Sequence, residues 1–436
     1  MGLWWASLGQ DLARVACVGA YITGAEVLWR MTGAHVFWEF GKYATALIFL
    51  VYLIRTGGLR PPPAIFLYFA LLLPSITLTL ANGTLAEARN DVSFNLSGPF
   101  VLMVSVWFFR HARLSSSQLA RVFMTLIAPV VGVAAVALHS TVTASAIVFD
   151  RISNFTTSGG FGPNQVSAVL GFASLLAFLC ANEIALSKGV RTLMLGAMIV
   201  LAVESTLTFS RGGLYIFAGS ALVAMSYMFR DGRRRARLIL IVALCFIVAR
   251  YLAIPQLDVF TGGALANRFE DTRLTGRDDF ARADIETWRA HPILGVGPGQ
   301  GDVYREGQVG RPIAAHTEFS RLLAEHGLLG LVALLLLMGA GAQTLRRAPV
   351  EAAKATAAGM IVWSFLFMLV YGMRLVAPSF AFGLGFVTVL PNARTYFRRR
   401  PVQRGDSWRA ELLAGGRDGR RDTDSGASEA LRGRSR

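Results

Sequence analysis

Apolar residues in this chain are gathered into long blocks, and short polar segments separate these blocks. A helix needs about 20 mostly apolar residues to cross the hydrocarbon core of a bilayer. The blocks predict about twelve membrane spans, at 11–29, 34–54, 63–81, 95–110, 120–138, 164–186, 191–209, 212–229, 238–254, 318–345, 355–373 and 376–392. We therefore expect an all-α integral membrane protein with one large polar loop between its ninth and tenth spans.

Basic residues mark every second junction between these spans. They occur at Arg55/Arg60, Arg110/Arg113/Arg121, Lys188/Arg191, the run 230–237, Arg346/Arg347 and the tail from Arg394. Cytoplasmic loops of membrane proteins carry an excess of lysine and arginine. The alternation predicts that both chain ends lie inside the cell, and that residues 139–163 and 255–317 lie outside.

The same pattern divides the chain into consecutive parts. They are the N-terminal spans in 1–163, the next spans in 164–254, the large outer loop in 255–317, the C-terminal spans in 318–392 and a basic tail in 393–436. The loop holds seven arginines and nine acids together with helix and turn signals. A loop of this length in a compact protein is usually functional. From Arg394 on, twelve arginines and six acids without an apolar period predict a disordered cytoplasmic segment near anionic lipid.

Composition supports a membrane protein and argues against a nucleic-acid-binding protein. The chain is 54% hydrophobic and 16% charged, whereas soluble domains carry about 25% charged residues. Its formal net charge is +16, but the basic residues lie at span junctions and in the tail, where they suit a lipid surface. Cys17, Cys180 and Cys245 lie in apolar blocks without a CxxC pair, so neither a disulfide framework nor a thiolate metal site is indicated.

Arg211 ends an apolar block in the sequence TLTFSRGG, on the side where the charge pattern disfavours an unpaired arginine. One interpretation is an interfacial arginine whose side chain reaches the headgroups. The other is a guanidinium that binds a phosphate, with Gly212 and Gly213 letting the backbone approach the ligand closely.

The loop sequence LTGRDDFARADIETWRAHPILGVGPG predicts one helix followed by a turn. Thr275 and Asp278 resemble a capping box, which places Arg277 in the first helical turn, where a cation opposes the helix dipole. An arginine beside a helix N-terminus suits phosphate binding. The alternative is an ion pair of Arg277 with Asp278 or Glu270. Asp278 and Asp279 point in different directions on a helix, so they are poor candidates for a shared Mg²⁺ ion.

His316 lies where the loop meets the next span, in AAHTEFSRLLAEHGLLG. It is either structural or a general base, and it shares a predicted helical face with Ser320. Glu318, Arg321 and Glu325 follow at spacings that allow mutual pairing, and such a cluster in a membrane should face a cavity. The other histidines lack this setting and are interpreted as structural or interfacial: His35, His111, His139, His291 and His326.

These motifs in this order resemble those of the bacterial O-antigen ligase and O-antigen polymerase family of polytopic membrane glycosyltransferases. The similar motifs are GPNQ at 162–165, SRGG, the TGRDD to GVGPG stretch and HTEF, and the resemblance covers about 160–345. It implies a GT-C-like helical bundle in the bacterial inner membrane, with an active site that faces the periplasm. It also implies a metal-independent inverting transfer without a cofactor. The implied partners are an undecaprenyl-diphosphate-linked glycan donor and a lipid A-core or other glycan acceptor.

The resemblance assigns catalytic roles to Arg211 in SRGG, Arg277 in TGRDD and His316 in HTEF. The two arginines would bind the donor diphosphate, and the histidine would activate the acceptor hydroxyl. The remaining substrate-binding candidates are Arg273, Arg282, Glu318 and Arg321. Arg273 or Arg282 is an alternative to Arg277. The chain departs from the family pattern after the histidine, where Thr317-Glu318 stands in place of the small amide that is often found there.

Two roles within the family and two outside it remain open from the sequence. A ligase moves a finished glycan onto lipid A-core, whereas a polymerase joins lipid-linked repeat units. A transporter of lipid-linked glycans would use charged residues in mid-span and duplicated halves, but here the ionisable residues gather at the outer ends and no repeat is visible. Peptidoglycan-type polymerases are a more distant alternative.

Overall fold

The computed structural model describes residues 1–58, 60–150, 152–183, 186–230, 232–270, 277–309, 317–348 and 351–390, with the backbone alone at 233–234, 277–278, 308–309 and 351–352. The helices and strands in the first half are α1 (Gly2–Leu8), α2 (Leu12–Met31), α3 (Phe40–Arg55), α4 (Pro63–Ala70), α5 (Ile76–Ala81), α6 (Leu85–His111), β1 (Arg113–Ser115), α7 (Ser116–Thr143), η1 (Thr156–Ser158), α8 (Pro163–Ala181), α9 (Lys188–Leu207) and α10 (Arg211–Met228). Those in the second half are α11 (Gly232–Val248), the π-helical segment η2 (Ala249–Ala253), α12 (Ile254–Thr261), α13 (Ala264–Glu270), α14 (Arg277–Ala290), α15 (Gly301–Val309), α16 (Glu318–Arg347), α17 (Glu351–Val370), α18 (Ala377–Leu384) and β2 (Thr388–Leu390).

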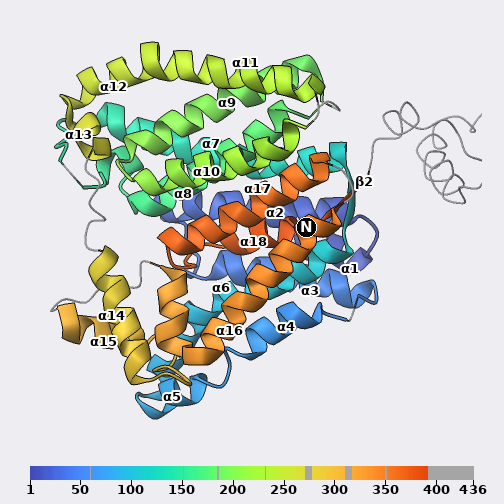
Figure 1. Ribbon diagram of the computed structural model, residues 1–436, viewed down its shortest axis with the longest axis vertical. Helices are drawn as coiled ribbons and strands as arrows, with labels where there is room; N and C mark the ends of the chain where they lie inside the picture. Colours follow the sequence, from blue (N-terminus) through green and yellow to red (C-terminus); the bar gives the residue numbers. More distant parts are fainter. Residues whose placement is uncertain are drawn as a thin grey trace, which may run out of the picture. The chain divides into compact units, whose positions relative to one another are not determined.

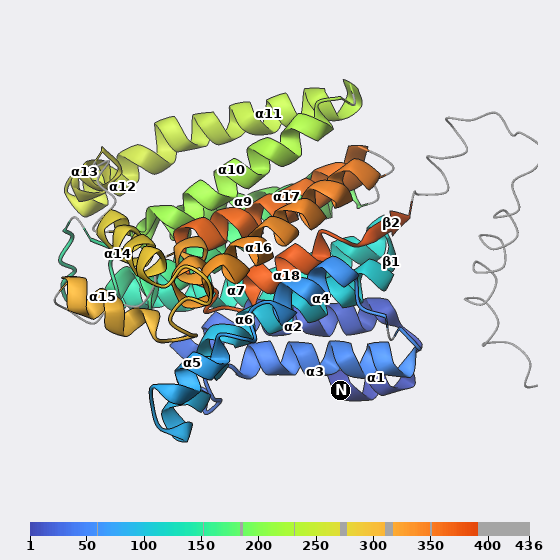
Figure 2. The ribbon, with the colours of Figure 1, turned by 60° about the horizontal axis from the view of Figure 1, so that its bottom comes forward.

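Long helices run alongside one another through most of the described chain, as Figure 1 and Figure 2 show. Eight helices in the described residues are long and apolar enough to cross a membrane. The prediction of an all-α membrane protein is therefore confirmed at this level. The count of about twelve spans and the periplasmic side of the loop stay predictions.

The third predicted span, at 63–81, is broken in the structure. α4 ends at Ala70 and α5 begins at Ile76, with Pro74 between them. Proline lacks the backbone N–H that would continue a helix, so the helix is interrupted at Pro74. At this break, Ser75 contacts a residue far along the chain. Its Oγ lies 2.5 Å from Nδ1 of the buried His326. The interpretation of His326 as a structural or interfacial residue stays a prediction.

α16 is also broken, at Gly327, where φ is 60° and ψ is −138°. Helical bonding is interrupted there, and the Gly-rich turn after α14 supplies the missing partners. Val296 N–H donates to the Ala324 carbonyl at 3.0 Å, and Gly297 N–H donates to the Glu325 carbonyl at 3.0 Å. A Cβ added at Gly327 would lie 2.5 Å from the Ile293 carbonyl oxygen, so only glycine fits this crossing. The GVGPG stretch thus fixes the first part of α16 in place.

α8 forms the centre of the bundle and is buried along most of its length. It lies directly against α10, because a Cβ added at Gly171 would be 2.3 Å from the Gly213 carbonyl oxygen. Small residues let membrane helices approach this closely. On another side of α8, Phe172 stacks on Trp363 of α17 with ring centroids 4.1 Å apart. The starts of α8 and α10, which carry GPNQ and SRGG, are therefore held at the same end of two packed helices.

The segment predicted as the outer loop is largely helical, as expected. The ninth span does not end at 254, because α11 continues through η2 into α12 as far as Thr261. α14 ends at Ala290, two residues before Pro292, and α15 follows it. Ser320 Oγ of α16 donates to Asp284 Oδ2 of α14 at 2.5 Å, so this outer segment is fixed to the membrane helix that follows it.

Two short strands, β1 and β2, were not predicted from the sequence. They pair in parallel, with Arg113 opposite Thr388 and Ser115 opposite Leu390. Thr388 N–H donates to the Ala112 carbonyl at 3.0 Å, which joins the end of α6 to the chain after α18. The predicted last span at 376–392 is thus the short helix α18 followed by β2. Residues 391–436, which include the predicted tail, lie outside the described chain.

Candidate functional site

The SRGG motif begins α10 and is bonded directly to the GPNQ motif at the start of α8. Ser210 Oγ donates to Asn164 Oδ1 at 2.7 Å, and the Tyr371 hydroxyl lies 3.1 Å from the same Ser210 oxygen. Ser167 Oγ donates to the Ser210 carbonyl at 2.8 Å. Both motifs contribute to the family resemblance of the sequence, and in the structure they belong to one hydrogen-bonded cluster.

Gly212 and Gly213 serve the packing of this cluster. A Cβ added at Gly213 would lie 2.0 Å from the Ser167 carbonyl oxygen, and one added at Gly212 would lie 2.0 Å from the Tyr371 hydroxyl. The space beside both glycines is therefore filled by protein. The expectation that these glycines let a ligand approach the backbone is therefore corrected. Because they lack a side chain, α8 and Tyr371 pack closely against α10 at these positions instead.

Phe209, just before the motif, has a left-handed backbone with φ of 58°, which no other non-glycine residue adopts in the described chain. Such a conformation costs about 1–3 kcal/mol and is found preferentially at functional sites. Arg268 of α13 donates from Nε to the Phe209 carbonyl at 3.2 Å, and only 6% of Arg268 is exposed. The ring of Phe209 stacks on Phe149 with centroids 5.2 Å apart. The outer helix α13 is thus attached to the SRGG turn.

Residues 371–376, between α17 and α18, connect this turn to the start of α16. At one end, Tyr371 contacts Ser210 as described above. Farther along, Met373 N–H donates to Glu318 Oε2 at 3.0 Å, and the Arg374 carbonyl accepts from Arg30 Nη2 at 3.3 Å. Arg30 also donates to Gln165 Oε1 of the GPNQ motif at 2.8 Å. This short connection therefore joins three of the sequence motifs.

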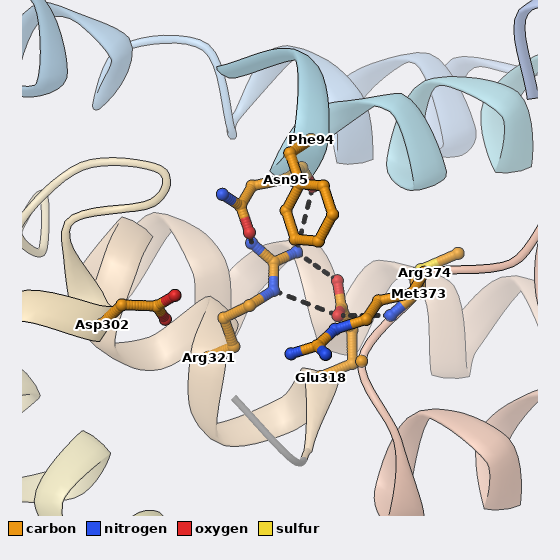
Figure 3. A pocket seen from close by; sticks show the side chains of 8 residues that line it. Phe94, Asn95, Asp302, Glu318, Arg321, Met373 and Arg374 are labelled. Atoms are coloured by element: carbon orange, nitrogen blue, oxygen red, sulfur yellow. Dashed lines mark hydrogen bonds and ion pairs between the residues drawn. The ribbon is translucent and has the colours of Figure 1, made fainter. Parts of the chain in front are cut away.

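Glu318, Arg321 and Glu325 form a buried ion-pair cluster at the start of α16, which confirms the pairing predicted from their spacing. Arg321 pairs with Glu318 through Nη2 and with Glu325 through Nη1, and each of these side chains is no more than 5% exposed. Arg321 Nη2 also donates to the Asn95 carbonyl at 3.2 Å. Figure 3 shows Arg321 between Asn95 and Glu318. A buried guanidinium with a carboxylate on each side is held in a fixed position, and neither carboxylate is buried without a cation.

A second buried cluster surrounds Arg305, and sequence reasoning missed it. Arg305 pairs with Asp284 of α14 and Asp302 of α15, and its side chain is fully buried. Burial raises the pKa of the Asp284 carboxyl, whereas Arg305 and the hydrogen bond from Ser320 oppose that rise. The cluster bonds α14, α15 and α16 to one another. The spacing of three residues between Asp302 and Arg305 signals one of these pairs, but no local spacing signals the other, because Asp284 and Arg305 belong to different helices.

The Glu318–Arg321 pair lines a narrow cavity of about 20 Å³ together with Asn95, Asp302 and Arg374. In Figure 3 the side chains of Asp302, Arg321 and Arg374 point toward a common space. Burial lowers the pKa of Arg374, but a guanidinium remains charged at any physiological pH. The prediction that the α16 cluster faces a cavity is confirmed.

A wider cavity of about 310 Å³ adjoins the narrow one, and three residues line both: Phe94, Asn95 and Asp302. Its other lining residues are Glu39, Asn90, Asp91, Ser93 and Gly299. Gln300 Nε2 donates to Asp91 Oδ2 at 3.2 Å on its rim. The lining is rich in carboxylate and amide oxygens, which accept hydrogen bonds from hydroxyl groups.

The structure brings some predicted site residues together and leaves others undescribed. Glu318 and Arg321 meet in the ion-pair cluster, and Arg211 is the first residue of α10 in the SRGG cluster. Arg282 is exposed on α14. Arg277 begins α14, about two turns before the anchored Asp284, but its side chain is not described. Arg273 and His316 lie outside the described residues.

Arg374 is a cavity residue that sequence reasoning missed, although a signal for it was present. It lies at the junction between the last two predicted spans, which the charge alternation places outside. The same argument that singled out Arg211 applies to it. Asn95 and Asp302 carried no comparable signal, because polar residues are common near helix ends.

No group of three histidine, cysteine, aspartate or glutamate side chains is arranged to hold a metal ion within the described part of the chain.

Residues 196–335 match the family model described as O-antigen ligase. The matched region runs from α9 through the SRGG motif and the outer helices into α16. No curated protein matches the chain. The match supports the resemblance to the O-antigen ligase and polymerase family. With the apolar helices, it indicates a multi-pass membrane enzyme of O-antigen ligase or polymerase type.

Proposed function

We propose that this chain transfers a glycan from undecaprenyl diphosphate to a hydroxyl of an acceptor sugar, at the periplasmic face of the bacterial inner membrane. The observation that carries the proposal is the connection at 371–376. It ties Ser210, beside Arg211, to Glu318, which follows His316 closely in sequence. Two groups of motifs that lie far apart in the chain are thereby connected around a polar cavity.

The donor diphosphate would be bound by Arg211 and Arg277. When the glycosyl group leaves, negative charge develops on the diphosphate oxygen. Guanidinium groups bind such oxygens in pairs and stabilise the developing charge. Arg211 begins α10, so the helix N-terminus adds to the positive potential. Arg273 and Arg282 are the alternatives to Arg277, and the exposure of Arg282 on α14 leaves it accessible to a ligand.

The acceptor would be activated by His316. The acceptor oxygen attacks the anomeric carbon from the face opposite the diphosphate, so the configuration inverts. A new carbon–oxygen bond forms as the bond from the anomeric carbon to the diphosphate oxygen breaks. The acceptor proton passes to the imidazole, and undecaprenyl diphosphate leaves with the bonding electrons. A positioned base of this kind contributes about 10²- to 10⁴-fold in rate.

The cavity of about 310 Å³ would receive the acceptor sugar. Asn95 and Asp302 continue its wall into the narrow cavity of Glu318 and Arg321. Its carboxylates suit a neutral sugar ring with several hydroxyls, and they would repel a phosphorylated one. In the ligase reaction the acceptor is a sugar of lipid A-core. In the alternative polymerase reaction it is the terminal sugar of a second lipid-linked repeat.

The test is glycan transfer by the purified full-length protein in nanodiscs. The donor is a defined undecaprenyl-diphosphate-linked glycan, and lipid A-core or a second lipid-linked repeat is the acceptor. His316→Ala and Arg277→Ala should each abolish the product while insertion and thermal stability are unchanged. The matched controls are His35→Ala and Arg289→Ala, which replace exposed side chains. Near-normal activity of either test variant removes that residue from the mechanism, and loss of activity with a chelator overturns the metal-free reaction.

A further inference from the structure

An aromatic pocket, distinct from the two polar cavities, lies between the end of α2 and the start of α3. Figure 2 shows these two helices side by side. The pocket has a volume of about 190 Å³. Aromatic rings line it from α2, from the connection to α3, from α3 itself and from the segment before α8: Trp29, Phe37, Trp38, Phe40 and Phe161. The connection at 34–38 is exposed, so the pocket is open at its rim.

A buried ion pair forms one wall of the aromatic pocket. Arg30 Nη2 donates to Glu26 Oε1 at 2.7 Å, and the two side chains are 7% and 3% exposed. The same guanidinium donates to the Trp38 carbonyl at 2.9 Å, and its central carbon lies 4.0 Å from the centroid of the Trp38 ring. Trp29 packs edge-on against Phe40 with centroids 5.6 Å apart. Contacts within the protein therefore hold the aromatic walls in place.

The charges in this wall are balanced, which favours a neutral ligand. Among the described residues that line the pocket, Glu26 and Arg30 alone are charged. Glu26 Oε2 accepts from the Val376 N–H at 2.7 Å, so both carboxylate oxygens already have a donor. A phosphate or ammonium group would have to disrupt this buried pair, which is costly. Each carboxylate oxygen keeps a second lone pair, which can accept a hydrogen bond from a hydroxyl group.

A sugar ring combines the two kinds of surface that this pocket complements. Its faces carry C–H groups with partial positive charge, which pack on the negative faces of aromatic rings, and its edge carries hydroxyls. A lipid acyl chain would suit the aromatic rings, but it would cover the buried carboxylate of Glu26 without offering a hydrogen bond. The chemistry of the pocket therefore favours a neutral sugar over a lipid.

The start of α3 places this pocket beside the wider polar cavity. Glu39 lines the polar cavity, whereas the adjacent Trp38 lines the aromatic pocket. A second connection runs through Tyr43, whose ring lies 6.2 Å from that of Phe37 and whose hydroxyl lies 2.7 Å from Oγ of Ser93. Ser93 lines the polar cavity, and Phe37 lines the aromatic pocket. The two cavities therefore share one short part of the chain as a wall.

We infer that the aromatic pocket binds a neutral sugar ring of the acceptor glycan, next to the ring that accepts the transferred glycan in the wider polar cavity. The inference rests on the proposed function and adds a second acceptor subsite to it. Arg30 connects this subsite to the conserved order of motifs described above, because it also donates to Gln165 Oε1 of GPNQ. Selection of the acceptor then depends on two consecutive sugars. Carboxylates and amides contact the terminal sugar, and aromatic rings contact its neighbour.

The main experiment removes one aromatic ring and compares acceptors of one and two sugars. They carry the terminal sugar, or the terminal two sugars, of the acceptor that is active in the transfer assay, each on the same octyl chain. Trp38→Leu should raise the KM for the two-sugar acceptor about tenfold and leave the KM for the one-sugar acceptor unchanged. The matched control is Trp4→Leu on α1, where the residue is 63% exposed and lies outside the pocket. An equal change for both acceptors, or no change for either, would overturn the inference.

A second measurement uses the unmodified protein in nanodiscs of phosphatidylethanolamine and phosphatidylglycerol and needs no transfer activity. The probes are two-sugar glycosides from lipid A-core and from the lipid-linked repeat, each with a photoreactive diazirine on the sugar that is not terminal. One of the probes should label residues 34–41 or Phe161, and the same glycoside without the diazirine should displace it. Displacement by added phospholipid alone shows a lipid site and overturns the inference. Labelling elsewhere, or no labelling, by both probes also overturns it.

The two proposals fail in different ways. Labelling of the aromatic pocket without glycan transfer would contradict the proposed function and leave the sugar subsite standing. Transfer in which Trp38→Leu affects both acceptors alike, with labelling outside the pocket, would contradict the subsite and leave the proposed function standing.

Discussion

The hydroxyl of Tyr371 lies 3.1 Å from Oγ of Ser210, and this contact joins the end of α17 to the start of α10. The two residues are far apart in sequence, and the hydrogen bond between them is buried. It places the connection at 371–376 against the SRGG turn. The same connection then reaches Glu318 through the Met373 N–H. The geometry around Arg211 therefore depends on a segment outside the region that matches the O-antigen ligase family.

Tyr371→Phe should loosen this contact without disturbing the surrounding packing. The loss of one buried hydrogen bond costs about 1 kcal/mol, so the protein should remain folded with a slightly lower Tm. Because the SRGG turn loses a support, we expect kcat for glycan transfer to fall more than KM rises. Transfer kinetics and thermal unfolding in detergent measure the two effects. Tyr215→Phe, at a 53% exposed position on α10, is the control. An unchanged kcat in Tyr371→Phe would show that the contact is not needed.

Gly327→Ala should destabilise the break in α16. The added Cβ would lie 2.5 Å from the Ile293 carbonyl oxygen, in a left-handed backbone that alanine adopts only with strain. We expect a loss of about 2 kcal/mol or more, seen as a lower Tm. Gly339→Ala on the same helix is the matched control, because a Cβ there would meet nothing within 4 Å. Equal Tm values for the two variants would refute the argument from close approach.

Arg321→Met tests the buried ion-pair cluster. The change leaves Glu318 and Glu325 buried without their cation, which costs about 3 kcal/mol or more. We expect low expression and a markedly lower Tm. Arg14→Met is the control, because Arg14 and Asp11 form an exposed pair at the same spacing, with side chains 62% and 43% exposed. Exposed pairs contribute less than about 1 kcal/mol. Similar Tm losses in the two variants would mean that burial does not set the strength of this cluster.

Asp91→Asn tests the wider polar cavity as the acceptor site. Asparagine preserves the shape of the side chain but removes one negative charge from the wall. Hydrogen bonds to a charged acceptor are about twice as strong as neutral ones, so the KM for the acceptor should rise several-fold. The KM for the donor should not change, because Asp91 would contact the acceptor and not the donor diphosphate. Steady-state kinetics with each substrate varied in turn separates the two constants. A rise in the KM for the donor alone would contradict the assignment of this cavity as the acceptor site.

Local features of the molecule could be predicted from the sequence. Blocks of apolar residues gave the main helices, and the spacing of Glu318, Arg321 and Glu325 gave their pairing, because neighbours on a helix meet whatever the rest of the fold does. Pro292 correctly marked the end of α14. Each of these features depends on residues within a few turns of one another.

Contacts between distant segments could not be predicted in the same way. Arg305 meets Asp284 because α14 and α15 fold back on each other, and no spacing encodes that arrangement. The break at Gly327 is stable because the GVGPG turn supplies its hydrogen bonds, so the signal lies in another part of the chain. Arg374 could have been selected from its unfavourable location at an outer junction. Asn95 and Asp302, which line the same cavity, could not.

The pairing of β1 with β2 has a consequence for how the protein is made. β1 leaves the ribosome before the helices from α7 to α18, whereas β2 leaves it after them. Chains fold from the N-terminus as they are synthesised. The backbone groups of β1 that pair with β2 therefore stay without this partner while the intervening helices enter the bilayer. The ladder is completed only after all the helices from α7 to α18 have been made, so this strand pair closes around them late in folding.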